Sequence, residues 1–443
     1  MTTLPLTNRS PDELVMLHDD EPVSIGRFIA RAGMLTRQLP EGSPVINLCQ
    51  DRHAFSVTFA AAIMGGGCNL LPANRLKATV DELVSSFDGA VVVADRPLEG
   101  FTGAYVDPTE ALESQDMDRG IPKIPADQLA AVVFTSGSTG RSSRIEKPWQ
   151  TLHDSSLINL AQLDPPPGAR VLATVPPQHM WGLETSVLMP WFGPVTVASA
   201  HPFFVADICR QLDRIEHPRV LVSTPVHLRA LVESDAELPA IERVYSATAP
   251  LSRSLARDIE RLSGAKVVEI YGCSETGCLA RRQTARVEDW QLFEAFELTS
   301  DGDGTVARAA HLPGPVRLMD HLALRTDARF RLLGRQSDLV NIAGKRASLA
   351  ELTGILLDIP GVLDGVIFQP PETDDAPATR LAALVVAPNL EAADIRRALG
   401  RRVDAAFMPR PLRLVERLPR AETGKLPRQS LLQLFAQTCR QAG

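Results

Sequence analysis

The sequence predicts an α/β fold: a large N-terminal domain of mostly parallel sheets flanked by helices, and a small α+β domain after it. Two observations lead to this prediction. Through the first three quarters of the chain, short apolar runs typical of buried strands alternate with helical patterns, as in sheets covered by helices. After about residue 336 the pattern changes to a compact set of strands and two amphipathic helices. We therefore expect domains at residues 1–336 and 337–443, joined near the segment GRQSD.

The first third of the chain shows the alternation most clearly. Residues 24–38 place Ile25, Phe28 and Ile29 at helical spacing, which predicts an amphipathic helix. The run at 53–67 is rich in small residues and closes with three glycines, which favour the end of a helix. Short apolar runs predict strands at 43–50, 68–72 and 90–93.

Strand patterns continue through the middle and the end of the chain. In the middle, the apolar runs lie at 170–177, 219–225, 243–250 and 266–272. Several of them end in small or polar residues just before a helical stretch. Because open α/β sheets bind ligands at the carboxyl ends of their strands, we expect functional residues in these loops. In the C-terminal part, strands are expected at 363–371, 379–387 and 410–419, and helices at 349–357 and 391–403.

The composition is that of an ordinary globular protein. The 443 residues carry 46 Lys and Arg against 53 Asp and Glu, a net charge of −7, and 44% are hydrophobic. An acidic chain is a poor partner for nucleic acid or an anionic membrane surface, so neither is expected as a ligand. No run approaches the roughly 18 apolar residues of a membrane span, and the N-terminus lacks the pattern of a secretion signal. The six cysteines form no C-x-x-C pair, which favours a cytoplasmic protein without a disulfide framework or zinc site.

The strongest local signal is the segment AVVFTSGSTGRSSR at 131–144, which is rich in glycine and hydroxyl groups. An apolar strand runs into a loop whose backbone amides and hydroxyls can surround an anion such as a phosphate. The spacing of the glycines is not that of a Walker loop, G-x-x-x-x-G-K-[ST]. The residues of this candidate phosphate loop are Thr135, Ser136, Gly137, Ser138, Thr139 and Gly140.

This loop resembles the signature segment of the adenylate-forming superfamily, which includes acyl- and aryl-CoA synthetases and the adenylation domains of peptide synthetases. Four further segments resemble motifs of the same superfamily, in the same order: SATAPL at 246–251, IYGCSETG at 270–277, GRQSDLVNIAGKRASLAEL at 334–352 and LPRAETGKLPRQSL at 418–431. The resemblance implies an enzyme that joins a carboxylate to AMP, releases pyrophosphate and passes the acyl group to a thiol. It also implies that the N-terminal domain binds ATP and the acyl substrate, and that the C-terminal domain is a mobile lid.

The resemblance also implies ATP and Mg²⁺ as ligands. The first barrier is mostly electrostatic, because two anions must meet and the departing pyrophosphate must be stabilised. Glu275 corresponds to the glutamate associated with Mg²⁺, and Lys425 to the lysine that reaches into the active site during adenylation. The other ATP-binding residues implied outside the phosphate loop are Tyr271, Gly272, Ser274, Asp320 and Arg335.

The ribose-binding aspartate of the superfamily lies about fifteen residues before the arginine of the hinge motif. Counting back from Arg335 leads to Asp320 (335 − 15 = 320). Asp327 lies in a similar Thr-Asp pair but would require a deletion, so Asp320 is preferred.

The acyl pocket and the thiol channel are implied in the same way. His179 lies where members that activate acids often carry a histidine or an aromatic residue. Amino-acid-activating domains place an aspartate there to hold an ammonium group, so His179 favours a substrate without an α-amino group. The acyl-pocket residues are His179, Trp181, Gly182, Ala247 and Thr248, and the thiol-channel residues are Gly344 and Lys345.

The chain departs from the superfamily pattern in three respects. Ser142 and Ser143 replace the usual Pro-Lys pair after the phosphate loop, so Arg141, Arg144 or Lys147 is expected to supply the missing charge. The hinge position is Ser337 rather than the usual aspartate or lysine. The chain is also short, and together with the motifs QHMWGLETS and NIAGKRASL this resembles the compact ligases of aryl-polyene and xanthomonadin-type pigment pathways.

The leading hypothesis is an acid–thiol ligase that adenylates an aromatic, hydroxybenzoate-like acid and loads it onto the phosphopantetheine thiol of an acyl carrier protein. The nearest alternative is the same chemistry with coenzyme A as the acceptor. An alternative of another class is a non-catalytic nucleotide-binding or carrier-docking protein with the same fold, which the Ser142-Ser143 departure favours. The presence of both Glu275 and Lys425 speaks against that alternative.

Overall fold

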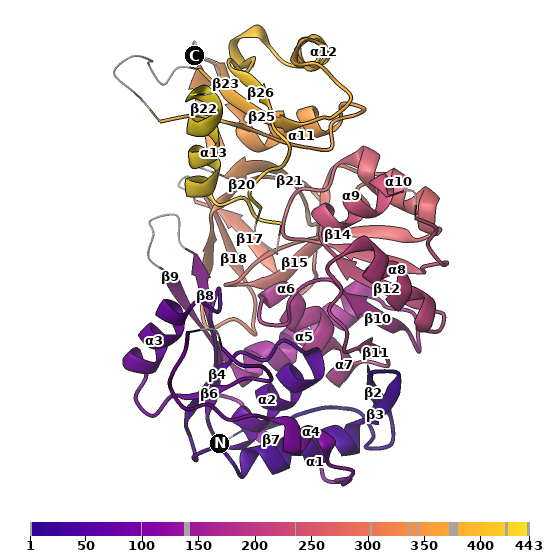
Figure 1. Cartoon of the computed structure of the whole chain (residues 1–443), viewed down its shortest axis with the longest axis vertical. Coiled ribbons are helices and arrows are strands. Elements are labelled where there is room, and N and C mark those ends of the chain that lie inside the picture. The colour runs from indigo at the N-terminus through magenta and orange to yellow at the C-terminus, as the bar shows by residue number, and fades with distance from the viewer. Residues whose placement is uncertain are drawn as a thin grey trace.

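The computed structural model describes the chain except residues 1, 99, 137–141, 235, 302–303, 336–337, 343–344, 372–379, 421–423 and 441–443. Figure 1 shows a large N-terminal domain with a smaller C-terminal domain, coloured orange and yellow, at one end of the long axis. This arrangement confirms the predicted α/β fold class with a small α+β domain at the C-terminus.

The largest sheet has eleven strands. In chain order they are β2 (Leu14–His18), β3 (Glu21–Ser24), β10 (Arg170–Ala173), β11 (Thr196–Ala198), β12 (Arg219–Ser223), β13 (Arg243–Ser246), β14 (Lys266–Cys273), β15 (Gly277–Arg282), β16 (Trp290–Leu292), β20 (Asp320–Leu324) and β21 (Arg329–Arg335). Their order in the sheet is β20-β21-β16-β15-β14-β13-β12-β10-β11-β2-β3. The strands from β14 to β2 are parallel neighbours, whereas the pairs at both ends are antiparallel.

A second sheet of five strands contains β4 (Pro44–Asn47), β5 (Cys68–Leu71), β6 (Val91–Val93), β8 (Leu129–Ser136) and β9 (Ser142–Pro148). Their order is β6-β4-β5-β8-β9, and only β9 runs antiparallel to its neighbour. Two small sheets complete the N-terminal domain: β1 (Thr3–Pro5) with β7 (Lys123–Pro125), and β17 (Glu297–Ser300) with β18 (Thr305–Arg308) and β19 (Val316–Leu318).

Helices cover both large sheets. They are α1 (Ile25–Thr36), α2 (Arg52–Met64), α3 (Lys77–Ser86), α4 (Thr109–Glu113), α5 (Trp149–Leu163), α6 (Met180–Leu183), a π-helix (Glu184–Leu188), α7 (Met189–Phe192), α8 (Val205–Arg214), α9 (Pro225–Glu233) and α10 (Arg253–Ser263). The main apolar cluster joins side chains of both sheets with α1, α2 and α5. Nearly every residue of α2 is buried, as expected for a helix that is apolar on all sides. A second cluster lies under α8, α9 and α10, and a third under α3. Within the described ranges, no helix is both long and apolar enough to cross a membrane.

The C-terminal domain is built around a three-stranded sheet. It consists of β24 (Asp364–Phe368), β25 (Ala382–Val386) and β26 (Leu412–Leu414), and a hairpin of β22 (Leu339–Ile342) and β23 (Lys345–Ser348) precedes it. Its helices are α11 (Leu349–Leu357), α12 (Ala392–Leu399), a 3₁₀ turn (Ala405–Phe407) and α13 (Arg428–Arg440). One face of the sheet packs on α11 and α12, and the other packs on α13.

The helices and strands predicted from the sequence are present, with boundaries within a few residues of the expected ones. The antiparallel ends of the eleven-stranded sheet were not anticipated. Only three residues, 274–276, connect β14 to β15, and so short a connection forces a hairpin because parallel neighbours need a crossover of a dozen residues or more. The domain boundary at residues 336 and 337 lies outside the described residues and stays a prediction.

Candidate functional site

The motif segments lie at the carboxyl ends of the parallel strands, where the sequence led us to expect them. The candidate phosphate loop follows β8, His179 lies between β10 and α6, and Ala247 follows β13. The segment with Tyr271 and Glu275 spans the end of β14 and the turn into β15. Three of the four segments therefore lie at one edge of the eleven-stranded sheet, and the candidate phosphate loop lies at the carboxyl end of a strand of the five-stranded sheet.

The candidate phosphate loop lies in the sequence between two antiparallel strands, β8 and β9. Thr135 at the end of β8 lies opposite Ser143 in β9, and this return strand was not predicted. Residues 137–140 and Arg141 lie outside the described residues, as does the side chain of Ser136. Of the basic residues expected to replace the missing charge, Arg144 is engaged at the surface. It forms an ion pair with Glu146 at 2.7 Å and lies over the ring of Phe87 at 4.8 Å.

Lys147, another of those basic residues, points into the protein. Only 2% of it is exposed, and its Nζ donates a hydrogen bond to the carbonyl oxygen of Glu275 at 2.7 Å. Burial lowers the pKa of Lys147, and the negative charges of Glu184 and Glu275 oppose this effect. Lys147 thus attaches the end of β9 to the backbone of the loop that carries the predicted metal ligand.

Glu184 lies beneath the same loop and was not identified from the sequence. It is 1% exposed, and its Oε2 accepts hydrogen bonds from the backbone N and the Sγ of Cys278, each at 3.2 Å. Burial raises the pKa of Glu184, whereas these donors and Lys147 lower it. Gly277 has a φ of +72°, and a Cβ there would lie 2.3 Å from Oε1 of Glu184, so the motif needs glycine at this position. The one sequence feature that could have pointed to Glu184 is its position as a glutamate within an apolar run. In the structure a π-helix begins at Glu184, and π-helices are often found at functional sites.

The structure brings Tyr271 and Asp320 together. The Tyr271 hydroxyl donates to Oδ2 of Asp320 at 2.7 Å, and the Tyr271 ring packs against Trp290 and Phe330. Asp320 also lies directly opposite Arg335 in the pairing of β20 with β21. Asp327, the alternative, lies in the turn at the other end of this hairpin with a φ of +60°. The geometry therefore favours Asp320 as the partner of the motif, and its role toward ribose stays a prediction.

The remaining residues of this motif lie around the turn. Gly272 pairs with Cys278 across the hairpin. Ser274 and Glu275 form the turn itself, and the Glu275 side chain is exposed.

His179 lies immediately before α6 and is mostly buried. Burial, together with the positive charges of Lys425 and Arg75, lowers its pKa to about 4. The imidazole is therefore neutral at pH 7. The effect of the Lys425 charge on His179 indicates that this exposed residue of the C-terminal domain lies on the same side of the molecule. The neighbouring Gly424 packs near Thr224, which follows β12.

The other predicted acyl-pocket residues lie in α6, which follows His179, and after β13. Trp181 is 7% exposed and donates from Nε1 to the carbonyl oxygen of Ser223 at 3.3 Å. Gly182 packs directly against the backbone of Pro176. Ala247 is buried, and Thr248 has a φ of +80°, a strained backbone conformation of the kind that concentrates at functional sites.

Two further histidines near this pocket, His201 and His227, were not predicted from the sequence. The Oγ1 of Thr174 lies 2.9 Å from both the Ser223 hydroxyl and Nδ1 of His227, and Nε2 of His201 lies 3.2 Å from the Thr174 carbonyl oxygen. Burial lowers the pKa of His201 to about 3 and that of His227 to about 4. The carboxyl ends of β10 and β12 therefore carry a polar but uncharged network. Nothing in the isolated sequence distinguished these histidines from surface ones.

In the lid motifs, the structure describes only part of what was predicted. Lys345 forms an ion pair with Asp404 at 2.6 Å within the C-terminal domain, and this contact lowers the pKa of Asp404. Ser337 and Gly344 lie outside the described residues, and so does the side chain of Arg335. The predicted roles of these residues in the hinge, the thiol channel and ATP binding stay predictions.

A separate group of possible metal ligands consists of His18, Asp51 and His53, whose ligand atoms lie within 4.8 Å of one another. Nη1 of Arg31 lies 3.1 Å from Nε2 of His53, so Nε2 accepts the hydrogen bond and Nδ1 carries the ring hydrogen. A histidine in that state offers no lone pair to a metal, and the arginine repels a cation. This group does not fit a metal ion.

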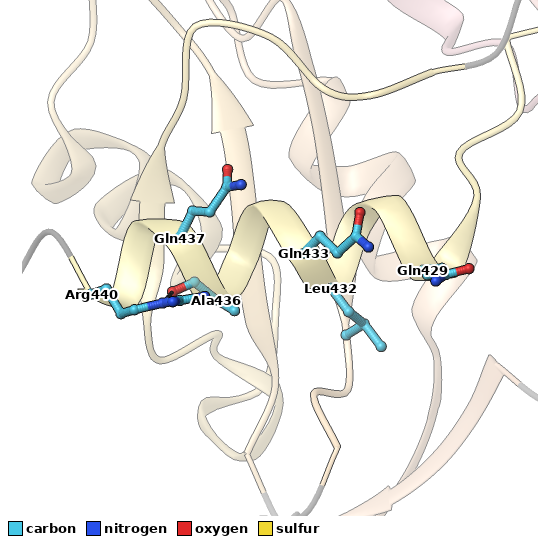
Figure 2. A pocket seen from close by; sticks show the side chains of 6 residues that line it. All are labelled: Gln429, Leu432, Gln433, Ala436, Gln437 and Arg440. Carbon is cyan, nitrogen blue, oxygen red and sulfur yellow. Dashed lines mark hydrogen bonds between the residues drawn. The ribbon is translucent and has the colours of Figure 1, made fainter.

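Figure 2 shows a shallow depression on the C-terminal domain, and all the side chains that line it project from α13. They are Gln429, Leu432, Gln433, Ala436, Gln437 and Arg440. None of them belongs to a predicted site.

Comparisons with known proteins agree with the motifs. Residues 32–295 match a family model described as AMP-binding enzyme, which covers well over half of the chain. The chain belongs to this family. Among curated relatives, the AMP-binding enzyme described here is 28% identical to a 4-coumarate–CoA ligase of Rhodobacter capsulatus over 308 residues, which cover 67% of this chain and 74% of the relative. It is 17% identical to a 3,4-dihydroxybenzoate–[aryl-carrier protein] ligase of Bacillus anthracis over 313 residues, 69% of this chain and 74% of the relative.

Solved structures show the same fold. The o-succinylbenzoate coenzyme A synthetase of Bacillus subtilis in complex with AMP has a TM-score of 0.80 at 17% identity, covering 97% of this chain and 98% of that chain. The anthranilate CoA ligase AuaEII in complex with anthranoyl-AMP has a TM-score of 0.80 at 15% identity, with 99% of each chain covered. Another structure of the Bacillus subtilis synthetase contains ATP and a magnesium ion. The chain is thus an adenylate-forming acid–thiol ligase of the AMP-forming kind, as the motifs predicted.

Proposed function

We propose that this enzyme adenylates an aromatic, hydroxybenzoate-like acid with ATP and transfers it to the phosphopantetheine thiol of an acyl carrier protein. The observation that supports the proposal is that Gly424, the residue before Lys425, packs near Thr224 at the carboxyl end of β12, and that the charge of Lys425 acts on His179. The same sheet carries the Tyr271–Asp320 pair, and Glu275 lies in the turn after β14. This arrangement supports the proposal that the residues predicted for the acid, the nucleotide and the metal form one site.

In the first step, a carboxylate oxygen of the acid attacks the α-phosphorus of ATP, and the bond from that phosphorus to the pyrophosphate oxygen breaks. The Lys425 ammonium group faces the reacting oxygens and stabilises the negative charge that builds up between them. His179, being neutral, neither repels Lys425 nor competes with it for the carboxylate. Asp320 accepts hydrogen bonds from the ribose hydroxyls, and the Tyr271 hydroxyl holds its carboxylate in place.

Magnesium fits the residues present. A hard divalent cation takes carboxylate oxygens, and Glu275 presents an exposed carboxylate on a loop whose backbone is held by the buried Lys147. When bound there by Glu275, Mg²⁺ neutralises charge on the phosphate oxygens.

The acid is aromatic and lacks an α-amino group. A neutral His179 beside the cationic Lys425 offers no negative charge for an ammonium group, and the uncharged network of His201, His227 and Thr174 suits polar substituents on a ring. Two relatives are named for aromatic acids, 4-coumarate and 3,4-dihydroxybenzoate, which supports this class of substrate.

In the second step, a thiol sulfur attacks the acyl carbon of the adenylate, the bond to the AMP oxygen breaks, and AMP leaves. We assign residues 337–443 as the lid that turns at Ser337 for this step, with Gly344 and Lys345 along the thiol arm.

We also propose that the enzyme belongs to the compact ligases of aryl-polyene and xanthomonadin-type pigment pathways and works in the cytoplasm. Coenzyme A is the alternative acceptor, which the names of the 4-coumarate relatives favour.

One assay tests the proposal. Purified enzyme receives ATP, Mg²⁺ and a mixed library of benzoates, fatty acids and amino acids, with either coenzyme A or a holo acyl carrier protein, and mass spectrometry identifies the thioester. A hydroxybenzoyl thioester of the carrier protein is the expected product. A coenzyme A thioester alone would favour the other acceptor, and amino-acid or fatty-acid products would refute the aryl assignment. ATP binding without any pyrophosphate release would indicate the non-catalytic alternative.

A further inference from the structure

Arg229 in α9 reaches from the N-terminal domain to the C-terminal domain. Its guanidinium donates to the carbonyl oxygen of Leu363 and lies 3.5 Å from a carboxylate oxygen of Asp364, the first residue of β24. The side chains of Arg229 and Asp364 are only 16% and 21% exposed. Burial lowers the pKa of Arg229, and the negative charge of Asp364 opposes that change, as expected for a cation held at an interface by its partner.

Asp364 also binds Arg420, which comes five residues before Lys425. Nε and Nη2 of Arg420 donate to the two carboxylate oxygens of Asp364 at 2.7 and 2.8 Å, the two-pronged geometry that arginine forms with a carboxylate. The remaining nitrogen, Nη1, donates to the carbonyl oxygen of Gly424 at 2.9 Å. One guanidinium therefore connects Asp364 to the residue immediately before Lys425.

Gly424 lies against the beginning of the same helix, α9. It is buried and has a φ of +77°, and a Cβ at this position would lie 3.2 Å from Cγ2 of Val226 and 3.7 Å from Oγ1 of Thr224. Glycine adopts this backbone conformation without strain, and it also allows the close approach. The segment before Lys425 is thus attached to α9 twice, directly through Gly424 and indirectly through the chain from Arg420 to Arg229.

We propose that Arg229, Asp364 and Arg420 are positioning residues that hold the backbone of Gly424, and with it the Lys425 ammonium group, beside His179 during adenylation. The inference rests on the role proposed above for Lys425. A lysine has a long flexible stem, so its charge is directed at a reacting atom only if its backbone is held in place. A displacement of about 1 Å can reduce a rate by about 100-fold. Arginine is required at position 420 because the fork uses three nitrogens in fixed directions, which a lysine ammonium group cannot reproduce.

The test compares Arg229→Ala with Arg210→Ala in the full-length enzyme. Arg210 is an exposed arginine of the neighbouring α8 that pairs only within its helix, with Asp207, so it serves as a matched control. Two rates are measured: pyrophosphate release with ATP and the benzoate that the wild type activates fastest, and AMP release from the supplied aryl-adenylate on addition of the thiol acceptor. We expect Arg229→Ala to lower kcat for the first step by about tenfold and to change the second by less than twofold. Arg210→Ala should leave both rates unchanged, and Arg229→Lys should recover part of the loss. Equal losses in both steps, or no loss in the first, would overturn the inference.

A second measurement needs no substrate. Hydrogen exchange of peptides that cover residues 418–427 should be faster in Arg229→Ala and in Arg420→Lys than in the wild type, and unchanged in Arg210→Ala. Unaltered exchange in both variants would overturn the positioning role even in an active enzyme. A wild-type protein that forms no adenylate but shows the expected exchange would instead refute the proposed function and leave the contact chain intact.

Discussion

The loop that carries Glu275 and the loop that carries Lys425 are held by different kinds of contact. Beneath Glu275, the charges of Lys147 and Glu184 are almost entirely buried, at 2% and 1% exposure, and belong to the N-terminal domain. Beside Lys425, the side chains of Arg420, Arg229 and Asp364 are about one-fifth exposed; Arg420 pairs with Asp364 within the C-terminal domain, and Arg229 pairs with it across the two domains. Buried contacts are costly to break, whereas partly exposed ones can separate and re-form. From this comparison we predict that the contacts beneath Glu275 stay in place during the reaction and that those beside Lys425 can separate.

The largest expected effect is on catalysis and concerns Lys425. Lys425→Ala should lower the rate of adenylate formation by about 1,000-fold, because one preorganised charge at the reacting oxygens contributes that much. The free energy of unfolding should hardly change, since Lys425 is exposed. Pyrophosphate release measures the first step, and conversion of supplied acyl-AMP to thioester measures the second, which should be spared. Equal adenylation rates in variant and wild type would contradict the role of Lys425.

Beneath Glu275, we expect a change at Lys147 to affect mainly the stability of the fold. Lys147→Met should lower the free energy of unfolding by about 4 kcal/mol, because it leaves Glu184 buried without a compensating cation and the Glu275 carbonyl oxygen without its donor. Urea denaturation provides the measurement. The matched control is Lys77→Met, whose exposed pair with Asp81 should contribute less than about 1 kcal/mol. Similar losses in both variants would show that the buried contacts of Lys147 contribute no more than an exposed ion pair.

A pH series tests the uncharged network at the acyl pocket. Burial lowers the pKa of His227 to about 4, so the unfolded chain binds a proton below about pH 6.5 while the folded protein does not until about pH 4. The free energy of unfolding should therefore fall as the pH drops through this window. His227→Gln should remove up to about 3 kcal/mol of that fall, whereas His217→Gln, at an exposed position, should keep the wild-type slope. Identical slopes in the two variants would refute the buried, neutral state of His227.

The smallest expected effect concerns the nucleotide. Tyr271→Phe removes the hydrogen bond to Asp320 and keeps the ring contacts with Trp290 and Phe330, so the variant should fold normally. The KM for ATP should rise about fivefold, corresponding to about 1 kcal/mol for one hydrogen bond to a charged group. Steady-state kinetics with varied ATP measures it, and Tyr105→Phe, at an exposed position, is the control. An unchanged KM would argue against Asp320 as the ribose ligand.

Local patterns were sufficient for most of the fold. The helix at α1 followed from apolar spacing and is started by Ser24, whose hydroxyl accepts a hydrogen bond from the backbone N of Arg27. The antiparallel strands β9, β15 and β21 were not predicted, because hairpin pairing depends on which distant strand lies alongside.

For the candidate site, the ordered motifs led to the residues that carry chemistry, and spacing led to Asp320, which the structure places beside Tyr271. The sequence did not predict the buried residues that support the site. Glu184 and His227 resemble any other glutamate or histidine in a helix, and what distinguishes them is burial, which depends on the packing of segments far apart in the chain.

The sequence alone determined the type of chemistry, and it predicted the groups that bind ATP and the acid, because those groups lie in short motifs that can be recognised without knowledge of the fold. The tertiary structure alone decided how these groups are held. It brought Lys147 under Glu275, and it connected Arg229 through Asp364 and Arg420 to the residue before Lys425. The contact of Lys147 with Glu275 joins residues 128 positions apart, and that of Arg229 with Asp364 joins residues 135 apart. Only the folded chain specifies the burial and direction on which the strength of these contacts depends.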